Sequence, residues 1–178
     1  GYRIAFSNFD VDLVSKYTQN DVEQLMQNKT IVRNRLKINS AINNAKKFIE
    51  IQKEFGSFDD YLWGFVSYEP IKNKFKKYSD LPAYTKISEK LSQDLKKHGF
   101  SFVGPTICYA LMQAVGMVND HTVDCFRYWK LWSIANQVSR SIYLFLNLIF
   151  FTTSSNRFNG TILTMLVDAI PVSMQSFS

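Results

Sequence analysis

The chain is poor in cysteine, with two among 178 residues. Two cysteines cannot build a disulfide framework, so a disulfide-stabilised fold is excluded and the core has to come from side-chain packing. The same usage suits a reducing compartment, and we expect a cytoplasmic protein. The first apolar stretch is interrupted by Arg3, Asn8 and Asp10, a pattern that does not fit a secretory signal.

Long apolar runs are also missing. The two longest, at 142–151 and 162–172, fall short of the roughly 20 residues that a membrane-spanning helix needs. The sequence around them lacks the Lys- and Arg-rich polar face of an interfacial helix. We therefore expect that the protein does not require a membrane.

The composition predicts one domain followed by a segment that is nearly uncharged. Hydrophobic residues make up 46% of the chain and the net charge is +6, which excludes a disordered chain. Residues 1–125 hold 17 Lys and Arg and 14 Asp and Glu, whereas 126–178 hold five charged residues in all. We expect a domain over 1–128 and, over 129–178, an aberrant or lineage-specific apolar tail.

Apolar periodicity predicts helices, and no segment alternates as a strand would, so the fold class is all-α. The longest predicted helix covers 33–55 and ends at Gly56, with Leu36 and other apolar residues on one face. Lys37, Asn44, Lys47 and Lys53 form its predicted polar face. Further helices are expected after a capping box at Asn20 and Glu23, over 58–66 after Ser57, and over 88–97.

Residues 97–116 have the form of a helix-hairpin-helix. One helix stops at Gly99, a short glycine-flanked turn follows, and Pro105 takes the first position of the next helix. Glycines let a DNA strand approach the backbone, and the free N–H groups of a helix N-terminus point at an anion. Phe100 and Phe102 are expected to anchor the turn in the core. The alternative is a helical hairpin with a tight glycine turn and no ligand. The candidate DNA-binding residues are Gly99, Phe100, Phe102, Val103, Gly104, Pro105 and Thr106.

Several motifs in order resemble the DNA-3-methyladenine glycosylase I family: YRIAFSNFD, IVRNRLKINSAINNAK, YLWGFV and KKHGFSFVGPTICYALMQAVGMVNDH followed by TVDC. The resemblance covers residues 1–128. It implies an all-helical, monomeric base-excision repair enzyme that acts on double-stranded DNA. Such an enzyme flips an alkylated adenine out of the duplex and cleaves its N-glycosidic bond.

The resemblance also implies a structural zinc ion with four ligands, two of which match His121 and Cys125. Their spacing of four residues would place both on one helical face, as a tetrahedral zinc site allows. The family's other two ligands and its base-recognising Glu lie before the segment that matches GYRIAF. We therefore expect a chain that lacks the family's N-terminal part, has unknown catalytic residues and is catalytically impaired, with an open core face that lowers its stability.

The remaining polar residues leave alternatives open. Asp120 is expected to cap a helix entering His121, the alternative being a transition-state carboxylate. The run from Lys72 to Lys77 is either a solvated loop or a phosphate-tracking segment, and Arg33 and Arg35 could also approach DNA. His98 is expected in solvent or near phosphate, and Cys108 in the core.

Two other functions remain open from the sequence. One is a non-catalytic DNA-binding module. The other is a membrane- or partner-associated protein driven by the tail. For the tail itself we favour a frame-shifted or read-through translation over a fusion or a functional appendage.

Overall fold

A computed structural model describes residues 1–128, and the predicted tail at 129–178 lies outside the described residues. The described part is mostly helical, which confirms the predicted fold class. Its helices are α1 Tyr2–Ala5, α2 Val11–Ser15, α3 Gln19–Gln27, α4 Arg35–Phe55, α5 Phe58–Gly64, α6 Lys86–Lys97 and α7 Pro105–Ala114. Single 3-10 turns, η1 and η2, cover Ser7–Phe9 and Tyr78–Asp80, and two short strands are β1 Ile71–Lys72 and β2 Val118–Asn119.

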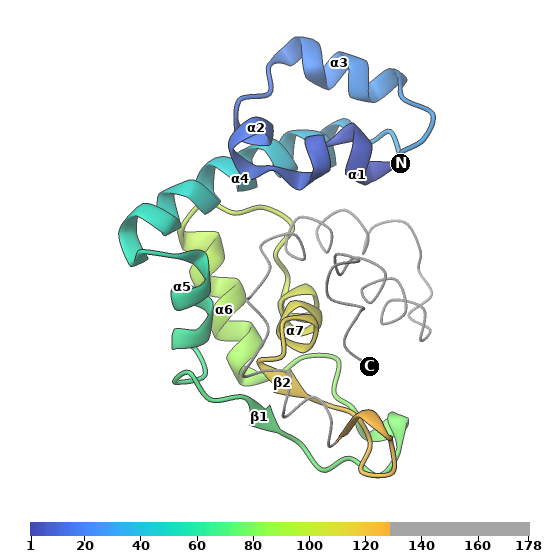
Figure 1. The fold of residues 1–178 in the computed structure, drawn as a ribbon, viewed down its shortest axis with the longest axis vertical. Coiled ribbons are helices and arrows are strands. Elements are labelled where there is room, and N and C mark those ends of the chain that lie inside the picture. The colour runs from blue at the N-terminus through green and yellow to red at the C-terminus, as the bar shows by residue number, and fades with distance from the viewer. Residues whose placement is uncertain (129–178) are drawn as a thin grey trace, which may run out of the picture.

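The long helix α4 is shared by two hydrophobic clusters. Its N-terminal half, through Ile38, Ala41, Ile42 and Ala45, packs under α1, α2 and α3. Its C-terminal half, through Phe48 and Ile51, packs against the helices α5, α6 and α7. In Figure 1, α1 to α3 lie on one side of α4 and the remaining elements on the other. The second cluster is the one that supports the glycine-rich turn.

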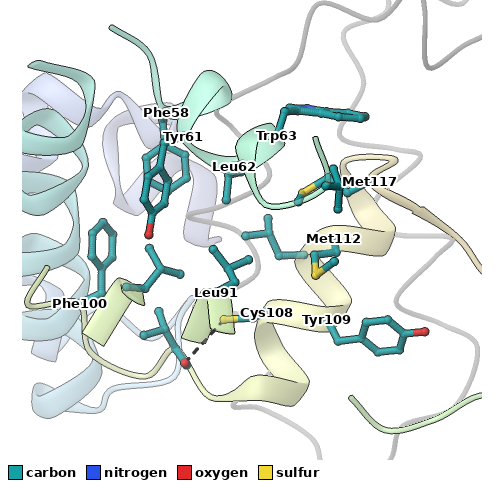
Figure 2. Close-up of a cluster of buried hydrophobic side chains, with 14 of the residues drawn as sticks. Phe58, Tyr61, Leu62, Trp63, Leu91, Phe100, Cys108, Tyr109, Met112 and Met117 are labelled. Carbon is teal, nitrogen blue, oxygen red and sulfur yellow. Dashed lines mark hydrogen bonds between the residues drawn. The ribbon is translucent and has the colours of Figure 1, made fainter. Parts of the chain in front are cut away.

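The second cluster is built largely from aromatic and sulfur-containing side chains (Figure 2). Phe58, Tyr61, Leu62 and Trp63 come from α5, where Ser57 accepts a hydrogen bond from the N–H of Asp60 and so caps the helix as predicted. Residues of α6 and α7 face them across the cluster, among them Leu91, Cys108, Tyr109 and Met112. Cys108 is 1% exposed, which confirms its place in the core.

Helix starts differ from the predicted ones by two residues at two places. The N-cap of α3 is Thr18, which forms its capping box with Asp21 and not through Asn20 and Glu23. The N-cap of α6 is Thr85, with Ser88 in the third helical position. In both cases a threonine lies just ahead of the predicted start, and its hydroxyl serves equally well as a cap.

The predicted polar and apolar faces of α4 are wrong at three residues. Leu36 is 72% exposed and Phe55, the last residue of the helix, is 42% exposed, whereas Asn44 is 0% exposed. Leu36 lies in the first turn of α4, ahead of the stretch that packs under α2. Asn44 falls three residues after Ala41 and four before Phe48, on the buried stripe of the helix. The buried side chain of Asn44 has its hydrogen-bond partner in the turn between α6 and α7, as described below.

A two-stranded parallel bridge joins β1 to β2, where the sequence predicts no strand. Ile71 pairs with Val118 and Lys72 with Asn119. Two residues are too few to show an alternating pattern, so the pairing follows from the tertiary fold. Within residues 1–128, no helix combines the length and the apolar character that crossing a membrane would need.

Candidate functional site

The predicted break between two helices is present at the glycine-flanked turn. Helix α6 ends at Lys97 with His98 as its C-cap, and Gly99 follows at φ +84°. Helix α7 begins at Pro105, with Gly104 as its N-cap. The two helices therefore do not run on as one rod, and Pro105 takes the first helical position as predicted. We call residues 99–104 the α6–α7 loop.

The α6–α7 loop is held from the protein side through its carbonyl oxygens. The side-chain amide of Asn43 donates to the oxygen of Gly99 at 2.8 Å. Asn44 donates to the oxygen of Ser101 at 2.9 Å and accepts from the N–H of Ser101 at 2.9 Å. The hydroxyl of Ser92, on α6, donates to the oxygen of Val103 at 2.6 Å. Every second carbonyl of the loop is thus turned inward and occupied.

Unlike these carbonyls, several N–H groups of the loop and of the first turn of α7 are not hydrogen-bonded within the described residues. Within the described residues, no acceptor is recorded for the N–H groups of Phe102, Val103, Gly104, Thr106 and Ile107. A helix leaves its first N–H groups without intrahelical partners, and the loop extends that set. Unpaired N–H groups at a helix N-terminus are suited to an anion such as phosphate.

The two phenylalanines of the loop have different surroundings. Phe100 is 4% exposed and belongs to the second hydrophobic cluster, near Phe58, so its predicted anchoring is confirmed. Phe102 is 43% exposed, and its predicted anchoring is wrong. The backbone of Phe102 lies at φ +59°, in the left-handed region, between the inward-facing Ser101 and Val103. The core takes Phe100 and Val103, and Phe102 is left on the surface.

The two glycines of the loop differ in backbone conformation and in what a side chain would meet there. Gly99 has a positive φ, and a Cβ there would lie 3.1 Å from Cε of Lys47. Gly104 has φ −67°, which any residue adopts, and a Cβ there would meet no atom of residues 1–128 within 4 Å. The conformation of the chain therefore demands glycine at Gly99 but not at Gly104. Within the described part of the chain, nothing fills the space beside Gly104.

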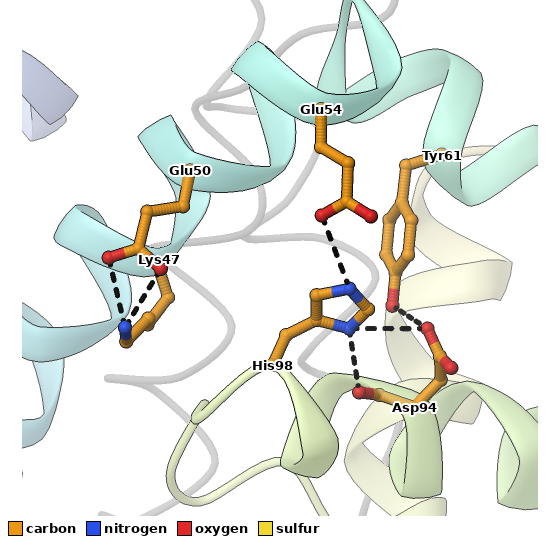
Figure 3. A network of polar contacts seen from close by, with 6 residues as sticks. All are labelled: Lys47, Glu50, Glu54, Tyr61, Asp94 and His98. Atoms are coloured by element: carbon orange, nitrogen blue, oxygen red, sulfur yellow. Dashed lines mark hydrogen bonds and ion pairs between the residues drawn. The ribbon is translucent and has the colours of Figure 1, made fainter.

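His98 lies beside this loop within a network of polar contacts (Figure 3). Its Nδ1 is 2.9 Å from the carbonyl oxygen of Asp94 and 3.4 Å from Oδ2 of that residue, and its Nε2 is 3.7 Å from Glu54. Tyr61 donates to Asp94 at 2.9 Å. Burial, followed by the Asp94 contact, raises the pKa of Tyr61 above its ordinary value, so its hydroxyl keeps the proton. The network joins α4, α5 and α6 below the loop.

His121 and Cys125 are brought together, but by a turn and not by the predicted helix. Nδ1 of His121 lies 3.4 Å from Sγ of Cys125. The N–H of Cys125 bonds to Thr122, and that of Val123 bonds to Phe75. The second bond holds the turn against the lysine-containing segment after β1. Burial, and then the charge of Arg127, lower the pKa of His121, which favours the neutral imidazole that a metal binds.

The fit of these residues to a zinc ion is partial. Nitrogen and sulfur are the ligand types that zinc prefers, and the two atoms are close enough to bind one ion together. In the part of the chain that the structure describes, no group of three or more His, Cys, Asp and Glu side chains could hold a metal. A four-ligand site would need two further ligands from elsewhere.

Asp120 does not cap a helix, because a turn and no helix follows it. Its side chain is 8% exposed and accepts three hydrogen bonds. Tyr109 and Gln113, both on α7, donate to Oδ2, the second at 2.6 Å, and Asn73 donates to Oδ1 at 2.7 Å. Burial, and then the hydrogen bond to Asp120, raise the pKa of the Tyr109 hydroxyl. Asp120 thus fastens the end of α7 to the segment after β1.

The basic residues singled out from the sequence have different surroundings. Lys74, Lys76 and Lys77 follow β1 in an exposed or half-exposed segment. Arg35 is engaged with Glu23 of α3, at 2.6 Å and 2.8 Å, and Arg33 precedes α4. Lys47 lies next to the α6–α7 loop, against Gly99, and pairs with Glu50 at 2.8 Å.

Sequence reasoning missed the residues that hold the loop, namely Asn43, Asn44 and Ser92. A signal for Asn44 was present in the sequence. The positions Ala41, Asn44, Phe48 and Ile51 follow steps of three, four and three, which is the buried stripe of a helix. A polar residue on such a stripe needs an internal partner. The partner itself, 57 residues further along the chain, could not be read from the pattern.

The comparisons with known proteins identify the family. A family model described as methyladenine glycosylase matches residues 1–128. The DNA-3-methyladenine glycosylase of Haemophilus influenzae is 41% identical over 124 residues, covering 70% of this chain and 67% of that protein. DNA-3-methyladenine glycosylase 1 of Escherichia coli is 42% identical over 127 residues, covering 71% of this chain and 68% of that protein.

Solved structures give the same result. A crystal structure of 3-methyladenine DNA glycosylase I is 42% identical with a TM-score of 0.67, covering 70% of this chain and 69% of that one. The Staphylococcus aureus enzyme, in a study of 3-methyladenine recognition, is 32% identical with a TM-score of 0.68, over 70% of this chain and 66% of that one. The chain belongs to the methyladenine glycosylase family.

Proposed function

We propose that this protein is a DNA-3-methyladenine glycosylase that hydrolyses the N-glycosidic bond of 3-alkylated adenine in double-stranded DNA. Water supplies the oxygen at C1′ and the bonding electrons leave with the base. A base alkylated at N3 already carries a positive charge, so it leaves more readily than a normal purine. The base leaves the stack before the bond breaks, and an abasic site remains.

The observation that carries the proposal is the α6–α7 loop in a chain of this family. Its carbonyls at Gly99, Ser101 and Val103 are occupied on the protein side, and the N–H groups of Phe102, Gly104, Thr106 and Ile107 are without acceptors in residues 1–128. We assign this loop to a DNA phosphate. Gly104 lets the strand approach, and Pro105 and Thr106 begin the helix whose N-terminus faces it.

The experiment is release of free 3-methyladenine from alkylated duplex DNA by the full chain. We expect release together with salt-dependent binding of duplex DNA. Undamaged duplex serves as the control and should release no base. The proposal fails if the chain neither releases 3-methyladenine nor binds duplex DNA.

A second candidate is a DNA-binding module without excision activity. It is favoured by Asp120, the candidate transition-state carboxylate, because its oxygens are occupied by Tyr109, Gln113 and Asn73. This candidate predicts duplex binding of normal salt dependence without release of base. The excision assay and a binding titration on the same preparation separate the two candidates.

We also propose that His121 and Cys125 supply two ligands of a structural zinc site. The ion would hold the turn after β2 in place and would take no part in the reaction. Metal analysis of the purified chain should detect bound zinc, and Cys125→Ser should lower that content. Equal zinc content in the Cys125→Ser chain and the parent chain would contradict the assignment.

Two further features belong to the proposal. The protein acts as a monomer, and it works in the cytoplasm, where a bacterial chromosome lies. The bacterial origin of the curated relatives and the buried thiol of Cys108 support a reducing compartment. Double-stranded DNA containing alkylated adenine is the partner, and no membrane takes part.

A further inference from the structure

We infer that Asn44 is a positioning residue for the DNA-binding loop: its side-chain amide, buried in α4, fixes Ser101 so that the α6–α7 loop presents N–H groups outward. The inference rests on the proposed function of that loop. Asn44 lies 57 residues before Ser101 in the chain. Its contact with the loop is therefore a purely tertiary one.

The contact has the pattern of a strand pair. Asn44 donates to the oxygen of Ser101 and accepts from its N–H, both at 2.9 Å. Of the uncharged side chains, only an amide offers a donor and an acceptor side by side in one plane. Two bonds from a rigid group fix both the position and the rotation of the Ser101 backbone. Leucine in that place would leave both groups of Ser101 without a partner.

The burial of Asn44 makes its bonds to Ser101 necessary. Asn44 is 0% exposed, on a stripe otherwise formed by Ala41, Ala45 and Phe48. Placing an uncharged amide there costs free energy unless both ends are hydrogen-bonded. Ser101 satisfies both ends, so the polar residue and the loop conformation depend on each other.

The direction of the loop carbonyls determines how the loop interacts with an anion. The oxygens of Gly99, Ser101 and Val103 are drawn toward Asn43, Asn44 and Ser92. A carbonyl oxygen carries partial negative charge and repels phosphate. Because these oxygens are bonded on the protein side, the N–H groups of Phe102, Gly104, Thr106 and Ile107, which belong to exposed or half-buried residues, are the backbone polar groups left for an anion. Asn44, at the centre of the three contacts, sets this arrangement.

A double-mutant cycle tests the inference. The full chain and its Asn44→Ala, Gly104→Val and Asn44→Ala/Gly104→Val variants are titrated with a 20-base-pair duplex that contains a stable abasic analogue. Each single variant should weaken binding about tenfold. The double variant should weaken it by about the same factor and not a hundredfold, because both changes remove the same contact.

The matched control is Ser40→Ala. Ser40 is also polar and buried on α4, at 6% exposure, but its hydroxyl donates to Lys37 of its own helix. It should leave DNA affinity unchanged. Amide hydrogen exchange provides the second readout: Asn44→Ala should speed exchange at Ser101 and its neighbours and leave α5 unchanged.

The outcomes separate the two ideas. If Gly104→Val weakens binding and Asn44→Ala does not, or if their effects multiply, the inference is overturned and the DNA-binding role of the loop stands. If Gly104→Val has no effect on a chain that binds duplex, the proposed role of the loop fails. Should Asn44→Ala not fold, Asn44→Ser replaces it in the cycle, since a hydroxyl keeps a polar group at this position but cannot make both bonds to Ser101.

Discussion

Gly99 and Gly104 lie five residues apart and are sensitive to substitution in opposite ways. Gly99→Ala should lower the free energy of unfolding by about 1 kcal/mol, because its φ of +84° suits only glycine. Gly104→Ala should change it by less than about 0.5 kcal/mol, because its φ is ordinary and the space beside it is open.

Thermal unfolding and duplex binding measured on both variants check this prediction. We expect lower thermal stability for Gly99→Ala and weaker DNA binding at unchanged stability for Gly104→Ala. The reverse assignment of the two effects would contradict it. The matched pair separates a glycine needed by the chain from one needed by the ligand.

Asp120 is the second residue whose environment leads to a prediction. Asp120→Ala should lower the free energy of unfolding by about 3 kcal/mol, since it leaves the donors of Tyr109, Gln113 and Asn73 without an acceptor. Asp120→Asn keeps the shape and part of the acceptor capacity and should cost less. Urea denaturation provides the measurement, and equal stability of the two variants would argue against the hydrogen-bonded role.

At the scale of elements, an exposed ion pair links α3 to α4. The two nitrogens of Arg35 donate to the two oxygens of Glu23, and this contact, then Gln19, lowers the pKa of Glu23 to about 2. A lowered pKa means that the stabilisation is complete above the ordinary value of 4.5. It is lost as the pH falls from there through about 2.

The expected result is a loss of stability between pH 4.5 and 2 that Glu23→Gln reduces. Because the pair is in solvent, salt should weaken its contribution. Urea unfolding at several pH values, at low and at high salt, measures both effects. An unchanged acid dependence in Glu23→Gln would show that other carboxylates set it.

At the scale of the whole molecule, α4 couples two hydrophobic clusters. Phe6→Ala should cost about 3–5 kcal/mol in the cluster of α1 to α3, and Phe48→Ala a similar amount in the cluster that supports α6 and α7. Phe48→Ala should therefore speed amide exchange in the α6–α7 loop much more than Phe6→Ala does.

Hydrogen exchange of the two variants under native conditions is the test. Equal acceleration at the loop in both would mean that the clusters unfold as one unit. Selective acceleration by Phe48→Ala would locate the support of the α6–α7 loop in the second cluster.

The sequence by itself determined the local features of this protein. The all-α class, the end of α4 before Gly56, the cap at Ser57 and the start of α7 at Pro105 each depend on neighbouring residues, and each is found where predicted. The family assignment also depends on the order of motifs alone. Local backbone preferences are sufficient for such features.

Only the tertiary structure decided which polar groups meet. Asn44 with Ser101, Asp120 with Tyr109 and Asn73, and β1 with β2 are all contacts between separate segments. It also turned Phe102 outward and formed the His121–Cys125 pair from a turn. A polar residue on a buried helix stripe indicates that a hydrogen-bond partner is needed, but which residue is that partner depends on how distant elements pack.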